Sequence, residues 1–121
     1  MREASRHFPR DRAAFDQNEL TGEATWYGSR FQGRSTANGE PFDMYRMTAA
    51  HRELPFNSIV RVTRDDDRRS VVVRINDRGP GSAHRVIDLS WAAAYEIGMV
   101  EQGHTDVRLE IVHWGDGAIY E

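Results

Sequence analysis

The segment that most constrains the fold is VVVRI, residues 71–75, which stops abruptly at NDRGPG. Its β-branched side chains are typical of a strand. The alternating segment IVRVT, residues 59–63, precedes it across the charged stretch RDDDRR, so the two predict a hairpin with a solvated tip. A strand that ends on NDRGP either turns there or presents Asp77 to a site, and the two interpretations are compatible.

Other segments predict further short strands by their alternation, namely GEATWYG (22–28), HRVIDLS (84–90) and TDVRLEIVHW (105–114). In the first of these, Ala24 and Trp26 share the face expected in the core. The segment SWAAAYEIGM predicts a helix, with Ser90 as its N-cap and Gly98 just after its end. About six short strands and one helix indicate an all-β fold, a small closed barrel with a helical insertion, because closure removes exposed strand edges.

Length and composition favour one soluble-type domain and exclude some function classes. The chain has 121 residues and a formal net charge of −3, which argues against a general nucleic-acid binder. It has no cysteine, so thiolate metal sites and disulfides are absent. We expect a polar N-terminal tether over residues 1–20, the barrel over 21–115 and a short tail over 116–121.

Three polar blocks lie where strands end or loops run, namely TANGEPFD (36–43), TAAHRELPF (48–56) and INDRGP (75–80). Asp77 could cap its own turn, and Glu40 could be an exposed loop acid. Together they could also form the carboxylate pair that glycoside cleavage uses. His51 is either a core histidine or a ring that orients a carboxylate. Tyr27 and Asn38 could stack on a sugar or hydrogen-bond to it.

No motif points to a different chemistry. The sequence contains no GxxxxGK or GxGxxG phosphate loop, no HExxH zinc motif and no GxSxG nucleophile elbow. The acidic hairpin tip has no further ligands at the spacing of a metal cage, so we expect neither a metal nor a cofactor. The residues alone therefore predict a barrel with an acidic rim and do not select a reaction.

These same blocks resemble the rare lipoprotein A family, whose members are cell-envelope proteins and include septal lytic transglycosylases. The resemblance is carried by GEATWYG, FQGRSTANGEPFDMYRMTAAHRELPFNSIVRVT, RSVVVRINDRGP and RVIDLSWAAAYEIGM, in that order. It implies a six-stranded double-psi β-barrel with one or two short helices and a groove for a glycan strand. It also implies a monomer in the periplasm or cell envelope, with any signal sequence and outer-membrane lipid anchor lying outside this sequence.

The resemblance also assigns roles residue by residue. It implies a catalytic group of Asp77, Glu40 and His51, and it implies that the groove is shaped by Tyr27, Asn38, Asp43 and Arg78. We favour Asp77 as the acid/base, although the sequence leaves an exchange of roles with Glu40 open. The stretch GSAH at 81–84 departs from the family pattern. This departure concerns how the substrate fits beside the Asp77 loop and not the fold.

The activity implied is cleavage of the β-1,4 bond between N-acetylmuramic acid and N-acetylglucosamine, with formation of a 1,6-anhydro end. Two alternatives remain open at the level of sequence. One is a non-catalytic module that binds peptidoglycan and loosens the wall as expansin-like proteins do. The other is an inverting glycoside hydrolase, which needs two carboxyl groups about 6.5–9.5 Å apart with a water between them.

Overall fold

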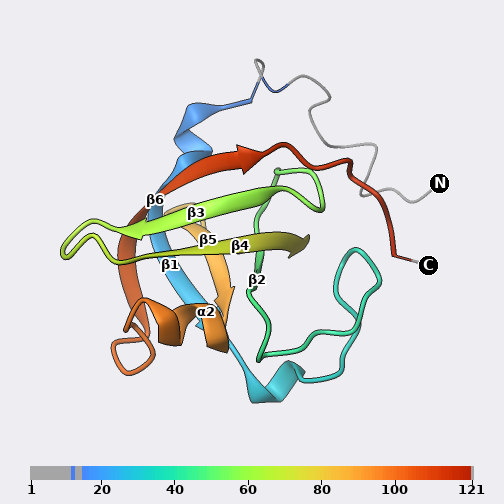
Figure 1. Ribbon diagram of the computed structural model, residues 1–121, viewed down its shortest axis with the longest axis horizontal. Helices are drawn as coiled ribbons and strands as arrows, with labels where there is room; N and C mark the ends of the chain where they lie inside the picture. Colours follow the sequence, from blue (N-terminus) through green and yellow to red (C-terminus); the bar gives the residue numbers. More distant parts are fainter. Residues whose placement is uncertain (1–11, 13–14, 121) are drawn as a thin grey trace.

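The computed structural model describes residue 12 and residues 15–120, which form a closed six-stranded barrel (Figure 1). Around the barrel the strands follow the order β1-β5-β2-β4-β3-β6. The pairs β1/β5 and β2/β4 are parallel and the other pairs are antiparallel. This confirms the predicted all-β barrel. The strands are β1 (Thr21–Tyr27), β2 (Thr48–Ala50), β3 (Ile59–Arg64), β4 (Ser70–Asp77), β5 (Arg85–Ser90) and β6 (His104–His113).

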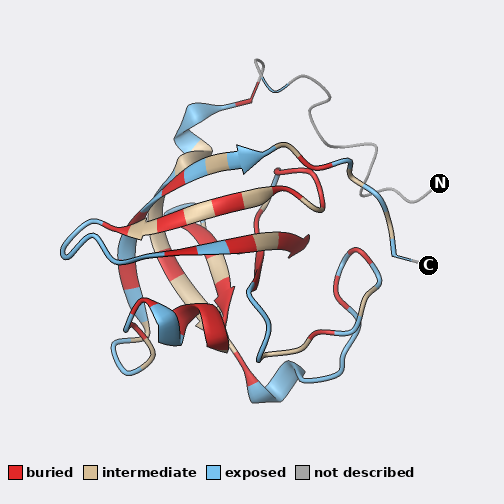
Figure 2. Ribbon diagram, viewed as in Figure 1, coloured by how far each residue is buried: buried red, intermediate tan, exposed pale blue. Residues whose placement is uncertain are grey.

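The core lies inside the barrel. Along most strands buried residues alternate with more exposed ones (Figure 2), as expected when every second side chain points inward. In the β3–β4 hairpin, the inward residues Val60, Val62 and Val73 are almost completely buried. In β1, Ala24 is buried and Trp26 packs partly buried against the core, as the alternation predicts. The short β2 is buried throughout, so the polar residues that follow it are held by a rigid element.

Helix α2 (Trp91–Glu96) begins where the sequence predicts. The Ser90 hydroxyl caps it by accepting from the Ala93 backbone N–H at 3.2 Å. The Arg64 guanidinium donates to the carbonyls of Ile97 and Gly98 at the other end, at 2.9 and 3.2 Å. Arg64 is therefore buried, which corrects the expectation of a fully solvated tip from residue 64 to residue 69. No helix in the described part of the chain is long and apolar enough to cross a membrane.

The two ends of the described chain pack on the barrel. The 3₁₀ helix η2 (Gln17–Leu20) leads into β1, and Phe15 beside it is 5% exposed, with its ring 5.8 Å from that of Trp114. The prediction of a weakly packed tether is therefore wrong at Phe15, which lies in the core, and at Leu20, which packs against it, whereas residues 16–18 are exposed. Residues 1–11, 13 and 14 lie outside the described residues. At the other end, the Tyr120 N–H donates to the Asn38 carbonyl at 2.7 Å.

Candidate active site

The register of the barrel brings two carboxylates into one row across four strands. Ala50 of β2 pairs with Asp88 of β5 on one side and with Asp77 of β4 on the other. Thr25 of β1 extends the row by pairing with Asp88. Paired residues on adjacent strands project to the same face of a sheet, so the small Ala50 side chain leaves both carboxylates on a common outer face. The row gives the barrel a localised acidic site.

Asp77 is half-buried at the end of β4 and is oriented by backbone groups. Its Oδ1 accepts hydrogen bonds from the N–H groups of Ala37 and Arg78, at 2.8 and 2.9 Å. Its Oδ2 lies 3.5 Å from the Tyr27 hydroxyl, at the long end of hydrogen-bond range. One oxygen is thus fixed by the protein, while the other faces a phenol across the site.

Tyr27 ends β1 and is held by aromatic neighbours. Its ring stacks on that of Phe42 at 4.5 Å between centroids, and the ring of Phe31 meets it edge-on at 5.8 Å. Burial, followed by the negative charge of Asp77, raises the pKa of Tyr27 well above its ordinary value. The hydroxyl therefore stays protonated and can donate toward Asp77.

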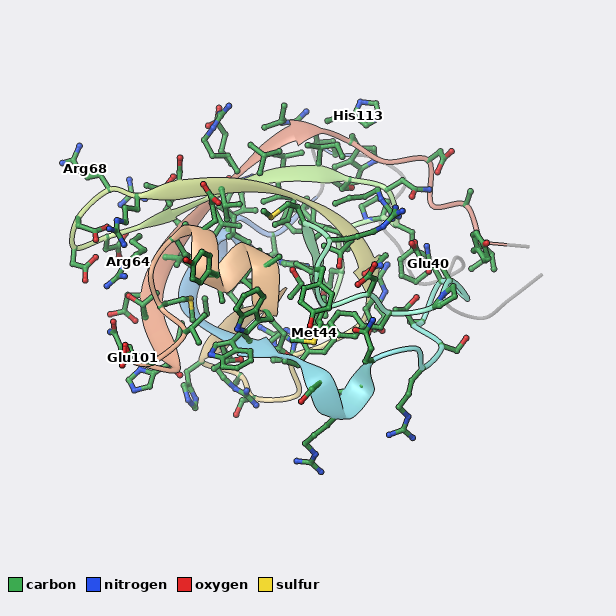
Figure 3. The ribbon with its side chains drawn as sticks, turned by 60° about the horizontal axis from the view of Figure 1, so that its bottom comes forward. Glu40, Met44, Arg64, Arg68, Glu101 and His113 are labelled. Atoms are coloured by element: carbon green, nitrogen blue, oxygen red, sulfur yellow. The ribbon has the colours of Figure 1, made fainter. Side chains whose placement is uncertain are left out.

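Glu40 is held as an ionised carboxylate by Arg74. The guanidinium makes two parallel hydrogen bonds to it, at 2.7 and 2.8 Å, and Asn38 donates a third at 2.8 Å. The hydrogen bonds from Arg74 lower the pKa of Glu40, whose side chain is 15% exposed. The pair borders a shallow hollow of about 290 Å³ that is also lined by Asn57 and residues 118–120. Figure 3 shows Glu40 on the loop that runs along this side of the barrel.

Asn38 and Asp43, both predicted to shape a groove, serve their own loop. Asn38 is 2% exposed, and its Oδ1 accepts from the Thr36 hydroxyl and from the Glu40 N–H at 2.7 and 3.1 Å. The Asp43 carboxylate accepts from the Tyr45 N–H at 3.0 Å and caps the following turn. The described contacts of these two side chains therefore explain the conformation of the loop.

His51 is completely buried and forms its ring hydrogen bonds with the backbone. Its Nδ1 accepts from the N–H groups of Glu53 and Leu54, at 3.0 and 3.1 Å, so Nε2 carries the proton and donates to the Glu19 carbonyl at 2.7 Å. Burial lowers the pKa of His51 from 6.5 to about 4. The expected side-chain bond to a carboxylate is replaced by these backbone bonds. The backbone N–H of His51 nevertheless donates to the backbone carbonyl of Asp77, at 3.2 Å.

The Arg78 side chain packs on Phe56 and bonds to the segment after β2. Its guanidinium carbon lies 4.1 Å from the centre of the Phe56 ring, and Nη1 donates to the His51 carbonyl at 2.7 Å. Burial lowers the pKa of Arg78 to about 9, so the group stays cationic at neutral pH. Arg78 thus ties the NDRGP turn to the segment after β2, and it orients the Asp77 backbone.

The loop beyond Asp77 is fixed by a second arginine. The Arg52 guanidinium donates to the carbonyls of Pro80, Ser82 and Arg85, at 2.8, 2.9 and 2.8 Å. The GSAH stretch therefore forms a braced turn, and its His84 side chain is exposed with Nε2 3.8 Å from Glu23.

Asp88 is the residue that the sequence analysis missed. Its Oδ1 accepts a hydrogen bond from the Thr25 hydroxyl, and the Arg85 Nη1 lies 3.8 Å from the same oxygen. An aspartate between the apolar residues Ile87 and Leu89 was the available signal. Only the barrel register shows that this residue shares a row with Asp77.

The closed six-stranded barrel, with its parallel pairs β1/β5 and β2/β4, places the chain in the class of double-psi β-barrel proteins. Within that class, the chain belongs to the family described as lytic transglycolase, which matches residues 19–109. The chain is 55% identical over 92 residues to the endolytic peptidoglycan transglycosylase RlpA of Vibrio cholerae, covering 76% of this chain and 35% of that protein. It is 48% identical over 114 residues to the protein of that name from Neisseria meningitidis serogroup B, covering 93% and 46%.

Solved structures show the same fold at lower identity. An expansin from Clavibacter michiganensis superimposes with a TM-score of 0.60 at 25% identity, covering 81% of this chain and 52% of that one. The Streptomyces papain inhibitor superimposes with a TM-score of 0.61 at 22% identity, covering 78% and 94%. The chain thus spans less than half the length of the curated relatives it matches, and the region that it shares with them is the barrel.

Proposed function

We propose that this barrel is a peptidoglycan lytic transglycosylase that cleaves the β-1,4 bond between N-acetylmuramic acid and N-acetylglucosamine. The family match and the printed names of the relatives support this reaction class. The observation that carries the proposal is the geometry of Asp77. Backbone N–H groups fix one of its oxygens, and the other faces the site beside the Tyr27 hydroxyl.

The proposal assigns the acid/base role to Asp77 rather than to Glu40. A general acid must carry a proton and release it to the leaving oxygen. Glu40 is poorly suited because Arg74 bonds both of its oxygens and lowers its pKa. Asp77 Oδ2 has the Tyr27 hydroxyl as its described hydrogen-bond partner, at the long end of hydrogen-bond range, so we assign to this oxygen the contact with the leaving glycosidic oxygen.

The reaction then proceeds without a water molecule. Asp77 gives the proton on Oδ2 to the glycosidic oxygen, and the bond from that oxygen to the muramic C1 breaks with its electron pair leaving on oxygen. The C6 hydroxyl of the same muramic residue bonds to C1 and returns its proton to Asp77, which closes the 1,6-anhydro ring. Acid–base assistance of this kind contributes roughly 10²–10⁴-fold to the rate.

The neighbouring side chains support that cycle. The Tyr27 hydroxyl stabilises the Asp77 carboxylate that exists between the two proton transfers. Asp88, on the same row, lies where its negative charge can stabilise the positive charge developing at C1. Glu40 and His51 act as positioning residues in this proposal, because Glu40 braces the loop that supplies the Ala37 N–H and His51 bonds to the Asp77 backbone.

The proposed substrate sets the proposed location. Peptidoglycan glycan strands lie outside the cytoplasmic membrane, so the protein acts in the periplasm or cell envelope. We propose that it acts there as a monomer. Outer-membrane anchoring in a longer form remains part of the proposal and would depend on residues outside this sequence.

Digestion of purified sacculi tests the proposal. The wild-type protein should release muropeptides with 1,6-anhydro ends, whereas Asp77→Asn should lower the rate by at least about 10²-fold with an unchanged circular dichroism spectrum. Glu40→Gln should reduce turnover less. Full activity of Asp77→Asn would remove Asp77 from the mechanism, and loss of activity in Glu40→Gln alone would exchange the two roles.

The same digest separates the alternative functions. Retention of the protein on sacculi without any anhydro product would indicate a binding module. New reducing ends without an anhydro ring would indicate an inverting hydrolase, with Asp88 as the candidate second carboxylate. Either product pattern would overturn the lytic transglycosylase proposal.

A further inference from the structure

Three aromatic side chains form an exposed strip beside the candidate active site. Tyr45 and Tyr95 are 67% and 65% exposed, and Trp91 lies between them. The rings of Trp91 and Tyr95 stack at 5.2 Å between centroids with an interplanar angle of 24°, and the Tyr45 ring meets Trp91 edge-on at 5.9 Å. The hydrophobic effect alone disfavours leaving such rings in water, so a strip of this kind marks a binding surface.

Local structure holds the strip in place. Trp91 and Tyr95 lie one helical turn apart on α2, which is why their rings stack. The turn that carries Tyr45 is tied to the start of this helix, because the Ala92 N–H donates to the Met44 carbonyl and the Ser90 hydroxyl donates to the Arg46 carbonyl, at 2.9 and 2.6 Å. These hydrogen bonds hold the turn that carries Tyr45 against α2, so the three rings are pre-organised.

The strip is continuous with the Asp77 site. Tyr27 pairs with Ser90 in the barrel register, so the last residue of β1 adjoins the N-cap of α2. The Tyr27 ring also stacks on Phe42, which leads directly into the turn that carries Tyr45. Figure 3 shows Met44 of this turn between helix α2 and the loop that carries Glu40. A linear polymer that crosses Asp77 can thus extend over the strip without leaving the surface.

We propose that the strip formed by Tyr45, Trp91 and Tyr95 binds pyranose rings of the glycan strand beyond the bond that is cleaved. This inference rests on the proposed function. In β-1,4-linked amino sugars the bulky substituents are equatorial, so each ring presents faces of axial C–H groups. These weakly positive hydrogens complement the negative face of an aromatic ring, and the tyrosine hydroxyls can bond to sugar hydroxyls at the edge.

The size of the strip favours a sugar chain over a protein partner. One aromatic side chain buries roughly 150–250 Å² when fully covered, so three that are already partly packed offer a few hundred Å². A stable protein interface buries about 800 Å² on each partner. A narrow row of rings that continues from the candidate active site matches the dimensions of a single extended polymer.

The test compares leucine and phenylalanine at the two exposed tyrosines. Tyr45→Leu/Tyr95→Leu keeps apolar side chains but removes both rings, while Tyr45→Phe/Tyr95→Phe keeps the rings and removes the hydroxyls. In co-sedimentation with purified sacculi, the leucine pair should bind about tenfold or more weakly than wild type, and the phenylalanine pair within about threefold. Trp91 is left unchanged because its side chain is half-buried.

The outcomes separate this inference from the proposed function. Equal binding of the leucine pair and the wild type to sacculi would overturn the claim that the strip binds glycan, even if the wild type releases anhydro products. A phenylalanine pair that binds as weakly as the leucine pair would also overturn it, because stacking would then not be the cause. Strip-dependent binding in the absence of anhydro products would uphold the strip and remove the proposed reaction.

Discussion

His51 should make the barrel lose stability as the pH falls, because burial prevents its ring from being protonated in the folded state. Its ordinary pKa is 6.5, and burial lowers it to about 4. The unfolded chain therefore binds a proton between these values while the folded chain does not. Stability rises with pH wherever the unfolded state binds more protons, so His51 costs stability as the pH falls below 6.5.

The magnitude follows from the two pKa values. For a group that titrates at 6.5 when unfolded and at about 4 when folded, lowering the pH from 7.5 to 5.0 costs about 2 kcal/mol. This window lies above the ordinary range of carboxyl groups, and the hydrogen bonds from Arg74 lower the pKa of Glu40 further, so Glu40 contributes little to it.

Urea unfolding of wild type and His51→Asn at both pH values measures this cost. The asparagine Oδ1 can accept the N–H groups of Glu53 and Leu54 that Nδ1 now accepts, and asparagine does not titrate. We expect the variant to be less stable at pH 7.5 but to lose about 2 kcal/mol less than wild type on going to pH 5.0. Equal losses in the two proteins would refute the buried, neutral assignment of His51.

Three substitutions test other contacts by urea unfolding at pH 7.5. Glu40→Gln should cost about 2 kcal/mol, because it leaves the Arg74 guanidinium half-buried without its carboxylate; an unchanged midpoint would contradict the pairing. Ser90→Ala should cost about 2 kcal/mol, because it removes both the cap on the Ala93 N–H and the hydrogen bond to the Arg46 carbonyl; an unchanged midpoint would show that neither bond contributes. Arg64→Met should cost about 1–2 kcal/mol by leaving carbonyls at the end of α2 without a donor, whereas no loss would show that those hydrogen bonds are dispensable.

Features set by neighbours in the sequence could be predicted. The hairpin of β3 and β4 follows from the alternation of IVRVT and SVVVRIN, since period-two burial is a local property. The start of α2 follows from Ser90, because a serine hydroxyl at this position can cap the first turn of the helix that follows it. Asp77 could be singled out because a carboxylate followed by Gly79 and Pro80 ends a buried strand abruptly.

Features that depend on register or on distant partners could not be predicted. The pairing of Glu40 with Arg74 joins a loop to a strand 34 residues away, so the sequence left Glu40 and Asp77 interchangeable as candidate acids. The two interpretations of His51 differ only in the partners of its ring, which come from Glu19 and from the backbone that follows. Asp88 joins the site solely through the barrel closure that sets Ala50 between two strands.

The central claim is that Asp77 serves a cleavage in which the sugar's own C6 hydroxyl, rather than water, displaces the leaving group. Digestion of purified sacculi in ¹⁸O-labelled water tests it most directly, with Asp77→Asn as the control and mass spectrometry of the new chain ends as the measurement. The account predicts 1,6-anhydro ends without ¹⁸O from wild type and almost no new ends from Asp77→Asn. Reducing ends that carry ¹⁸O, or equal release by both proteins, would contradict it.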